Sequence, residues 1–142
     1  MKKKNLLYVS ALCACMSFSF MGCSDDDDKQ EIPSLPEQIS LNGVYVLNSG
    51  KQESNNSSLS FYDFETKKVE ADIFKKVNGR GLGDTANDIL VYGSKAYIAV
   101  TNSNTIEVID LQGKSLKQIV SDGDPLQPRF FSCYNGKVYV SL

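Results

Sequence analysis

The chain has 142 residues, of which 15 are basic and 17 are acidic, so its formal net charge is −2. These residues include no histidine, which excludes serine–histidine–aspartate catalysis, cysteine–histidine catalysis and histidine-ligated metal sites within them. Residues 42–142 carry 11 acidic and 11 basic residues without a basic block, so this part of the chain lacks the charge pattern that binds nucleic acid.

The N-terminal segment, residues 1–22, has the pattern of a bacterial signal peptide. Three consecutive lysines, Lys2 to Lys4, precede an apolar stretch that runs from Leu6 to Met21. This stretch is shorter than the ~20 residues that a membrane-spanning helix comfortably needs. We therefore predict that it is an export signal that is removed from the mature protein.

The end of this segment contains a candidate lipidation site. Phe20-Met21-Gly22-Cys23 resembles the lipobox of bacterial lipoproteins, in which the cysteine after a small residue becomes lipidated and N-terminal, although Phe20 replaces the usual leucine. A competing match, Leu12-Cys13-Ala14-Cys15, would leave a very short apolar region before the cut and an apolar stretch after it. We expect lipidation at Cys23 and stable anchoring through more than one acyl chain.

Residues 23–41 are predicted to be a flexible tether. Asp25 to Asp28 and Lys29 follow the lipobox, and Pro33 and Pro36 disfavour regular structure. The aspartate run can be a solvated spacer, and together with the lysine it forms an enteropeptidase site. It also resembles the acidic export signal that follows the lipidated cysteine of surface lipoproteins in some Gram-negative bacteria. That resemblance, which we favour, implies an outer-membrane protein exposed on the cell surface.

The remainder, residues 42–142, contains an internal repeat of short β-rich runs separated by turn residues. One kind of run is centred on a tyrosine, and the other has an aspartate before its last residue. The matching runs are Gly43–Asn48, Lys95–Val100 and Lys137–Leu142, and Ser58–Phe64 and Thr105–Leu111. A period near 42 residues with four short strands per unit is typical of a β-propeller blade. No helical spacing of apolar residues is found beyond Met21, so we predict an all-β fold with blades of four antiparallel strands.

The predicted strands divide into three blades. The expected strands are residues 43–47, 58–64 and 68–74 in the first blade, 86–92, 95–100, 105–110 and 115–120 in the second, and 129–134 and 137–142 in the third.

At these strands the sequence resembles a known family. Tyr97-Ile98-Ala99-Val100-Thr101-Asn102, followed by Thr105 to Asp110, is similar to the repeat of YVTN-repeat (YncE-like) β-propellers. The resemblance covers residues 42–142. It implies that the chain is an N-terminal fragment, about two and a half blades of a ring of roughly 300–350 residues if seven blades are assumed. A small self-sufficient β-sandwich is the alternative.

Loop lengths separate two faces of such blades. Gly93-Ser94 and Asn135-Gly136 are tight hairpin turns, and the turns near 65–67 and 112–113 are also short. The longer connections should emerge together on the other face, which is where binding concentrates; they are residues 48–57, 75–85, 101–104 and 121–128.

This long-loop face is predicted to bind the ligand. Our candidate ligand-binding residues are Arg80, Asp84, Asn87, Asn102, Asn104 and Arg129, and the same loops also carry Asn48, Asn55, Asn56 and Asn78. Amides suit a neutral, hydrogen-bonding ligand better than a phosphate. Each asparagine has an alternative role as a turn former that tolerates left-handed backbone geometry.

Three further patterns have structural explanations. Gly79 to Gly83 lacks the spacing of a dinucleotide-binding loop, so we expect a flexible connection. Asp122 to Asp124 resembles the start of a calcium loop without its closing glutamate, so we expect a turn. Cys133 lies in an apolar run and is predicted to be buried.

A fourth pattern, Asp84 to Ala86, resembles a bacterial O-glycosylation acceptor.

The predicted function is binding rather than catalysis, because we find no catalytic constellation, metal site or cofactor site. Leu82-Gly83-Asp84-Thr85-Ala86 resembles a loop of lipoprotein propellers that include vitamin B12-binding partners of TonB-dependent transporters. This resemblance implies capture of a corrinoid-like nutrient for an outer-membrane importer. Amides and aromatic rings would make the contacts. The alternative is an adhesin or interaction scaffold that binds a protein or glycan at the cell surface.

Overall fold

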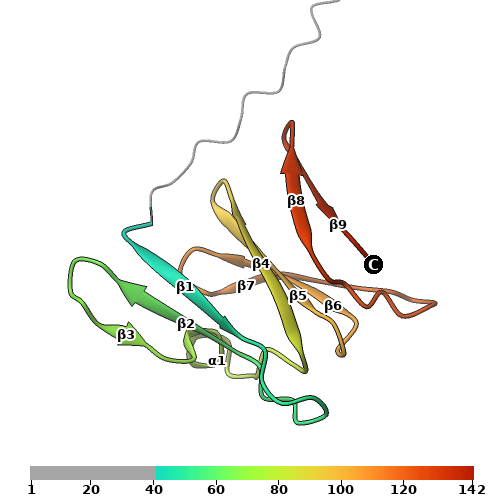
Figure 1. The fold of residues 1–142 in the computed structure, drawn as a ribbon, viewed down its shortest axis with the longest axis horizontal. Coiled ribbons are helices and arrows are strands. Elements are labelled where there is room, and N and C mark those ends of the chain that lie inside the picture. The colour runs from blue at the N-terminus through green and yellow to red at the C-terminus, as the bar shows by residue number, and fades with distance from the viewer. Residues whose placement is uncertain (1–40) are drawn as a thin grey trace, which may run out of the picture. The chain divides into compact units, whose positions relative to one another are not determined.

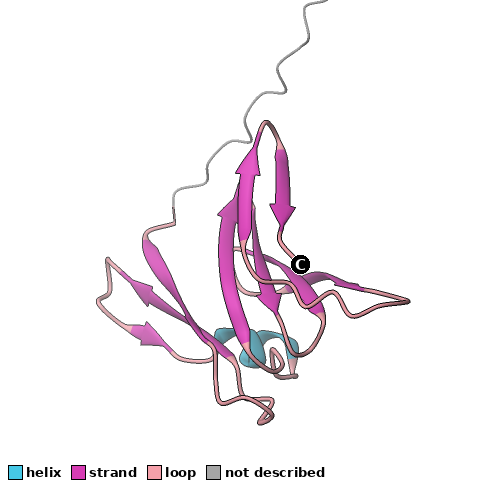
Figure 2. Cartoon of the chain, turned by 45° about the vertical axis from the view of Figure 1, so that its right-hand side comes forward, coloured by secondary structure: helices cyan, strands magenta, loops and turns pink. Residues whose placement is uncertain are grey.

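The computed structural model describes residues 41–142. The predicted signal peptide, the lipidation site at Cys23 and the tether therefore lie outside the described residues, apart from the last tether residue. The fold is all-β, as predicted, with three antiparallel sheets and one short helix (Figures 1 and 2). No helix in this part of the chain is long and apolar enough to cross a membrane.

Each sheet is formed by strands that are consecutive in the chain, which is the arrangement of propeller blades. Sheet 1 contains β1 (Gly43–Asn48), β2 (Ser58–Asp63) and β3 (Val69–Glu70). Sheet 2 contains β4 (Ala86–Tyr92), β5 (Lys95–Val100), β6 (Thr105–Asp110) and β7 (Ser115–Val120). Sheet 3 contains β8 (Phe131–Tyr134) and β9 (Lys137–Val140).

The predicted outer strand of the first blade, residues 68–74, is wrong over most of its length. β3 covers only two residues, and α1 (Ile73–Asn78) follows it, within what was expected to be strand and loop. The Asp72 carboxylate accepts from the backbone N–H of Lys75, and Gly79, with a φ of 68°, ends the helix by donating to the Lys75 carbonyl. A six-residue helix is too short to show a repeated helical spacing in the sequence.

The hairpin turns follow their residue types. In the turn between β8 and β9, Asn135 and Gly136 both have positive φ values, 49° and 77°, as a type I′ turn requires. Asp63 and Asp110 stabilise the β2–β3 and β6–β7 turns through their side chains. One carboxylate oxygen of each accepts from two backbone N–H groups of its turn. This shared role explains why the two aspartates recur at equivalent positions.

The core lies between sheets 1 and 2. Alternation along β1 turns Tyr45 and Leu47 toward sheet 2, where they pack against the buried cluster, while Val44 and Val46 stay exposed on the other face. The buried cluster contains Leu59, Ile73, Phe74, Leu82, Ala86, Ala96, Ile98, Val100 and Ile109. β5 and β6 are buried at nearly every position, as expected for strands covered on both faces.

Cys133 is exposed, so the prediction that it is buried is wrong. Strand alternation places it on the same face of sheet 3 as Phe131, whose ring lies 6.3 Å from that of Tyr97 on sheet 2. Sheet 3 has two strands in the described part of the chain, and so small a sheet leaves most of its side chains accessible.

Candidate functional site

The long connections gather as the sequence predicts. Tight turns join β4 to β5 and β8 to β9 at the upper end of the view in Figure 1, and the β1–β2 loop lies at the lower end. We define the loop face as residues 49–57, 79–85, 101–104 and 121–130, which are the connections on the side away from those tight turns. Hydrogen bonds between these connections hold them together.

Ser57 joins the first two connections of the loop face. Its backbone N–H donates to the Gly83 carbonyl over 3.0 Å, and its hydroxyl donates to the Ser49 carbonyl over 2.5 Å. The same hydroxyl accepts from the backbone N–H of Ala86 at 2.9 Å. Because Ser57 is buried, these bonds fix the β1–β2 loop against the start of β4.

Asp84 joins three connections. Its carboxylate accepts from the backbone N–H of Glu53 at 2.8 Å and from the Thr85 hydroxyl at 3.0 Å. Its own backbone N–H donates to the Ser103 hydroxyl at 2.9 Å. This predicted ligand-binding residue therefore already organises the loop face, and what it offers a ligand is the carboxylate's remaining acceptor capacity.

Three further hydrogen bonds tie the β5–β6 turn to its neighbours. The Thr101 hydroxyl donates to the Pro128 carbonyl at 2.7 Å, and the Thr101 N–H donates to the Thr85 carbonyl at 3.0 Å. The Asn104 side-chain oxygen accepts from the backbone N–H of Gln127 at 3.3 Å. Asn104 has a φ of 53°, so its alternative role as a turn former is also realised.

Gly83 is where two connections approach most closely. Its φ is 133°, and a Cβ added there would lie 2.5 Å from the Ser103 hydroxyl oxygen and 2.9 Å from Val100 Cγ1. Only glycine fits this position without displacement. The glycine of the Leu82–Ala86 motif is thus explained by packing of the loop face.

The other candidates differ in accessibility. Asn102 and Arg129 are exposed, and the half-buried Asn87 forms a bulge at the start of β4, between Ala86 and Asp88. Bulges re-aim side chains and are frequent beside binding sites. Asp84, Asn102 and Asn104 lie in connected loops, so the structure brings these three candidates together.

Arg80, another candidate, does not contact Asp84, Asn102 or Asn104 but binds residues of sheet 2. Its guanidinium donates to Glu107 Oε1 at 2.9 Å and to the Ser115 hydroxyl at 3.1 Å, and lies 4.8 Å from the centre of the Phe74 ring. Glu107 is fully buried in β6 and also accepts from the Ser115 hydroxyl, while its Oε2 has no partner among the described residues. Arg80 therefore compensates a buried charge.

Sequence reasoning missed Glu107, although a signal was present. A carboxylate between the apolar residues Ile106 and Val108, in a strand covered on both faces, requires a cation or hydrogen-bond donors. Asn78, which the sequence places among the amides of the long loops, is also engaged internally. Its side-chain amide bonds Phe74, Gly113 and Ser115 backbone groups, each at 2.8 Å, and fixes α1 to the β6–β7 turn.

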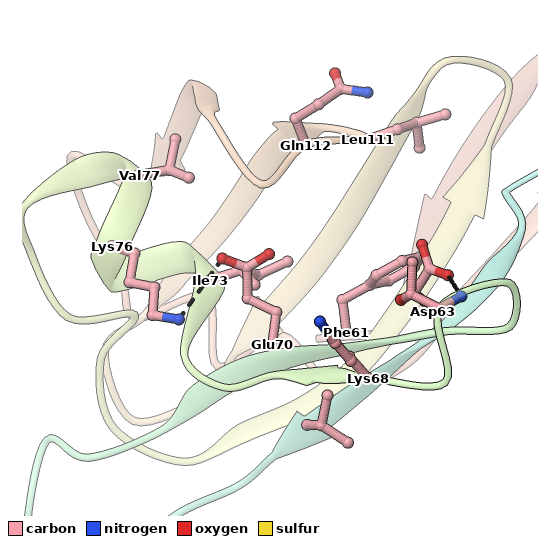
Figure 3. A pocket seen from close by; sticks show the side chains of 11 residues that line it. Phe61, Asp63, Lys68, Glu70, Ile73, Lys76, Val77, Leu111 and Gln112 are labelled. Atoms are coloured by element: carbon pink, nitrogen blue, oxygen red, sulfur yellow. Dashed lines mark hydrogen bonds and ion pairs between the residues drawn. The ribbon is translucent and has the colours of Figure 1, made fainter.

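A cavity of about 520 Å³ lies outside the loop face, between the β2–β3 turn, α1 and the β6–β7 turn (Figure 3). Lys68 and Glu70 enter it from β3 and its turn, and Leu111 and Gln112 lie on the opposite wall. Its lining combines apolar side chains with two lysines and two carboxylates. None of the six predicted ligand-binding residues lines it.

Two groups near this cavity have shifted pKa values. Burial, followed by the negative charge of Asp110, raises the pKa of Tyr45 from 10.0 to about 12. The Tyr45 hydroxyl donates to the Leu111 carbonyl at 2.7 Å, which ties sheet 1 to sheet 2. The backbone N–H of Thr66 beside the Asp63 carboxylate lowers the pKa of that group. The described residues contain no cluster of three or more metal-ligating side chains.

Comparison with known proteins identifies a family. Residues 42–141 match the family model described as a domain of unknown function, DUF5074. This match and the antiparallel sheets fit a β-propeller-like family. No curated protein matches the chain.

Proposed function

The chain belongs to the DUF5074 family, and from this premise we propose that it is a ligand-binding module of the cell surface whose loop face holds a neutral, hydrogen-bonding molecule. The observation that carries the proposal is the set of hydrogen bonds through Ser57, Asp84 and Thr101, which connects four separate chain segments. Loops fixed in this way lose little conformational entropy when a ligand binds.

The exposed groups of the loop face indicate the chemistry of the ligand. Asn102 is exposed beside Asn104, and residues 51–56 form an exposed polar loop. An amide presents both donors and acceptors, so it matches a ligand with many carbonyl, amide or hydroxyl groups. Apart from Arg80, the charged candidates are Asp84 and Arg129. Their charges have opposite signs, so the loop face does not favour an ionic ligand.

We propose more specifically that the ligand is a corrinoid-like nutrient. The support is the resemblance of residues 42–142 to YVTN-repeat propellers and of Leu82 to Ala86 to the vitamin B12-binding lipoproteins among them. A lipid at Cys23 would hold the module at the outer membrane, and a TonB-dependent transporter would receive the ligand. An adhesin that binds glycan or protein is the competing function.

The test compares the loop face with the tight turns. Asn102→Ala removes an exposed amide from the loop face, and Ser94→Ala changes a polar residue that is also exposed, in the β4–β5 turn. If cyanocobalamin binds at the loop face, Asn102→Ala should weaken binding roughly 5- to 150-fold in calorimetry, the equivalent of about 1–3 kcal/mol for a lost hydrogen bond. Ser94→Ala should leave the affinity unchanged.

Two results would argue against this assignment. Equal losses from both variants, with unchanged melting temperatures, would remove the loop face as the binding site. Binding of a glycan from a surface panel, without binding of cyanocobalamin, would replace nutrient capture by the adhesin function.

A further inference from the structure

The cavity between the β2–β3 turn, α1 and the β6–β7 turn is enclosed by two neighbouring sheets of the described chain (Figure 3). On one side lie β3 and α1, which stand where sheet 1 was expected to have a full outer strand. On the other side lies the turn at the end of β6. Its volume of about 520 Å³ falls in the range of small-molecule sites, roughly 300–1,000 Å³.

The apolar side chains that line this cavity are held by contacts to both sheets. Ile73 and Leu111 are only 5% and 9% exposed, and the Phe61 ring lies 5.2 Å from that of Tyr45. The Tyr45 hydroxyl in turn donates to the Leu111 carbonyl at 2.7 Å. Side chains that are fixed in this way need little rearrangement to hold the apolar part of a ligand.

Both carboxylates of the lining already have partners. Glu70 forms an ion pair with Lys76 Nζ at 3.6 Å (Figure 3). Asp63 Oδ1 accepts from the backbone N–H groups of Glu65 and Thr66, at 2.9 and 2.7 Å. A ligand cation would therefore have to compete for carboxylates that the protein itself uses.

The Lys68 ammonium, in contrast, has no ion pair with any residue in the range 41–142, where the paired cations are Lys76 and Arg80. Lys68 precedes Glu70 by two positions, and Glu70 is the register partner of Phe61. Strand alternation therefore directs Lys68 and Glu70 to the side of Phe61, and Figure 3 shows both entering the cavity. The cavity thus combines an apolar lining with a cation that lacks a counter-ion among these residues.

We propose that this cavity binds a small carboxylic acid with an apolar, ring-containing body. The ligand carboxylate pairs with Lys68, and its ring packs against Phe61, Ile73 and Leu111. An anion is favoured over a cation because Lys68 is unpaired among the described residues while Glu70 and Asp63 are engaged. None of the candidate residues of the loop face lines the cavity, so this is a second site that does not depend on the function proposed above.

An NMR titration of the isotope-labelled full chain with phenylacetate, phenylacetamide and acetate separates the two parts of the recognition. Phenylacetate carries the ring and the charge, the amide keeps only the ring, and acetate keeps only the charge. We expect phenylacetate to bind with a Kd of about 1 mM and the amide to bind about fivefold more weakly, as for the loss of an exposed ion pair. Acetate should not saturate the protein.

The position of the shifted signals and the relative affinities decide the outcome. Binding should shift the signals of β3, α1 and the β6–β7 turn and leave those of the loop face unchanged. Absence of phenylacetate binding, equal affinities for phenylacetate and its amide, or shifts centred on the loop face would each overturn the proposal.

Lysine variants test the role of Lys68. Lys68→Met removes the charge and keeps an apolar stem, so it should weaken phenylacetate binding about fivefold and leave the affinity for phenylacetamide unchanged. The matched control is Lys75→Met, since Lys75 is also exposed on α1, has no ion pair among the described residues and does not line the cavity. Equal losses from the two variants would reduce the effect to general surface charge and disprove the pairing.

Val77 provides an independent test that leaves Lys68 in place. This residue lines the cavity from α1 and is 49% exposed, so a polar replacement does not disturb the core. Val77→Glu brings a like charge close to the bound carboxylate and should weaken phenylacetate binding about fivefold. Val77→Gln, which has nearly the same shape without the charge, should bind phenylacetate more tightly than Val77→Glu. Equal affinities of the Glu and Gln variants would contradict the placement of the carboxylate in this cavity.

Discussion

The carboxylate of Glu107 shows how one residue constrains its surroundings. It is fully buried, and Arg80 and Ser115 donate to the same oxygen, Oε1. A buried carboxylate without a cation costs several kcal/mol. The connection that carries Arg80 must therefore stay close to β6, which links the base of the loop face to the core of sheet 2.

Arg80→Met should lower the free energy of unfolding by about 3 kcal/mol, because it leaves the Glu107 charge buried without its cation. Urea unfolding followed by circular dichroism measures the change. The double variant Arg80→Met/Glu107→Met should recover a large part of the loss, since it removes the charge as well. A double variant less stable than Arg80→Met would contradict this account.

Tyr45 should make the stability of the fold depend on alkaline pH. Its pKa is raised from 10.0 to about 12 in the folded protein, so the unfolded chain loses this proton first as the pH rises. The stabilising contribution is complete below pH 10 and decreases from there to about pH 12. Urea midpoints measured across this range should fall less steeply for Tyr45→Phe. Identical slopes would show that Tyr45 does not govern the loss.

Among the elements, α1 is one that could not be predicted from the spacing of apolar residues. Only Ile73 and Phe74 of its six residues are buried, and two adjacent apolar residues do not distinguish a helix from a strand. The decisive signals are local, namely the cap by Asp72 and the ending at Gly79. The hairpin turns, in contrast, were predictable because Asn-Gly has a strong preference for one turn geometry.

Gly83 should be sensitive to substitution both through its backbone and through its neighbours. Gly83→Ala brings a methyl group into contact with Ser103 and Val100 and requires a strained φ of 133°, so the free energy of unfolding should fall by about 3 kcal/mol. Gly79→Ala is the control, because its φ is also positive but no atom lies within 4 Å of the added Cβ. It should cost about 1 kcal/mol. Equal losses in urea unfolding would show that backbone strain alone matters at Gly83.

At the scale of the whole molecule, the internal repeat was the basis for predicting the strands and the position of the long loops. The four strands of sheet 2 have the bounds expected from the sequence, because each one is an apolar run between turn residues. The gathering of the long loops followed from their common position in the repeat. The pairing of Arg80 with Glu107 could not be predicted, because 27 residues separate them and α1, which sets their approach, leaves no periodic signal.

The proposed anchor at Cys23 lies outside the described residues and has its own test. Cys23→Ala should leave the precursor unprocessed and abolish labelling by a palmitate analogue, because the thiol is the acceptor. Cys15→Ala should leave the labelling unchanged. Unchanged labelling of the Cys23→Ala chain would identify a different acceptor, or none.

Sheet 2 differs from its neighbours in having another sheet against each face, and this fixes the order in which the structure comes apart. The amide hydrogens of β5 and β6 should exchange with solvent only through the largest opening, because their residues are almost completely buried. The hairpin of β8 and β9 can open at much lower cost, since most of its residues are exposed. Opening of this hairpin leaves the bonds of Ser57 and Asp84 intact. Much of the loop face would therefore persist in a partly unfolded molecule that has already lost its third sheet.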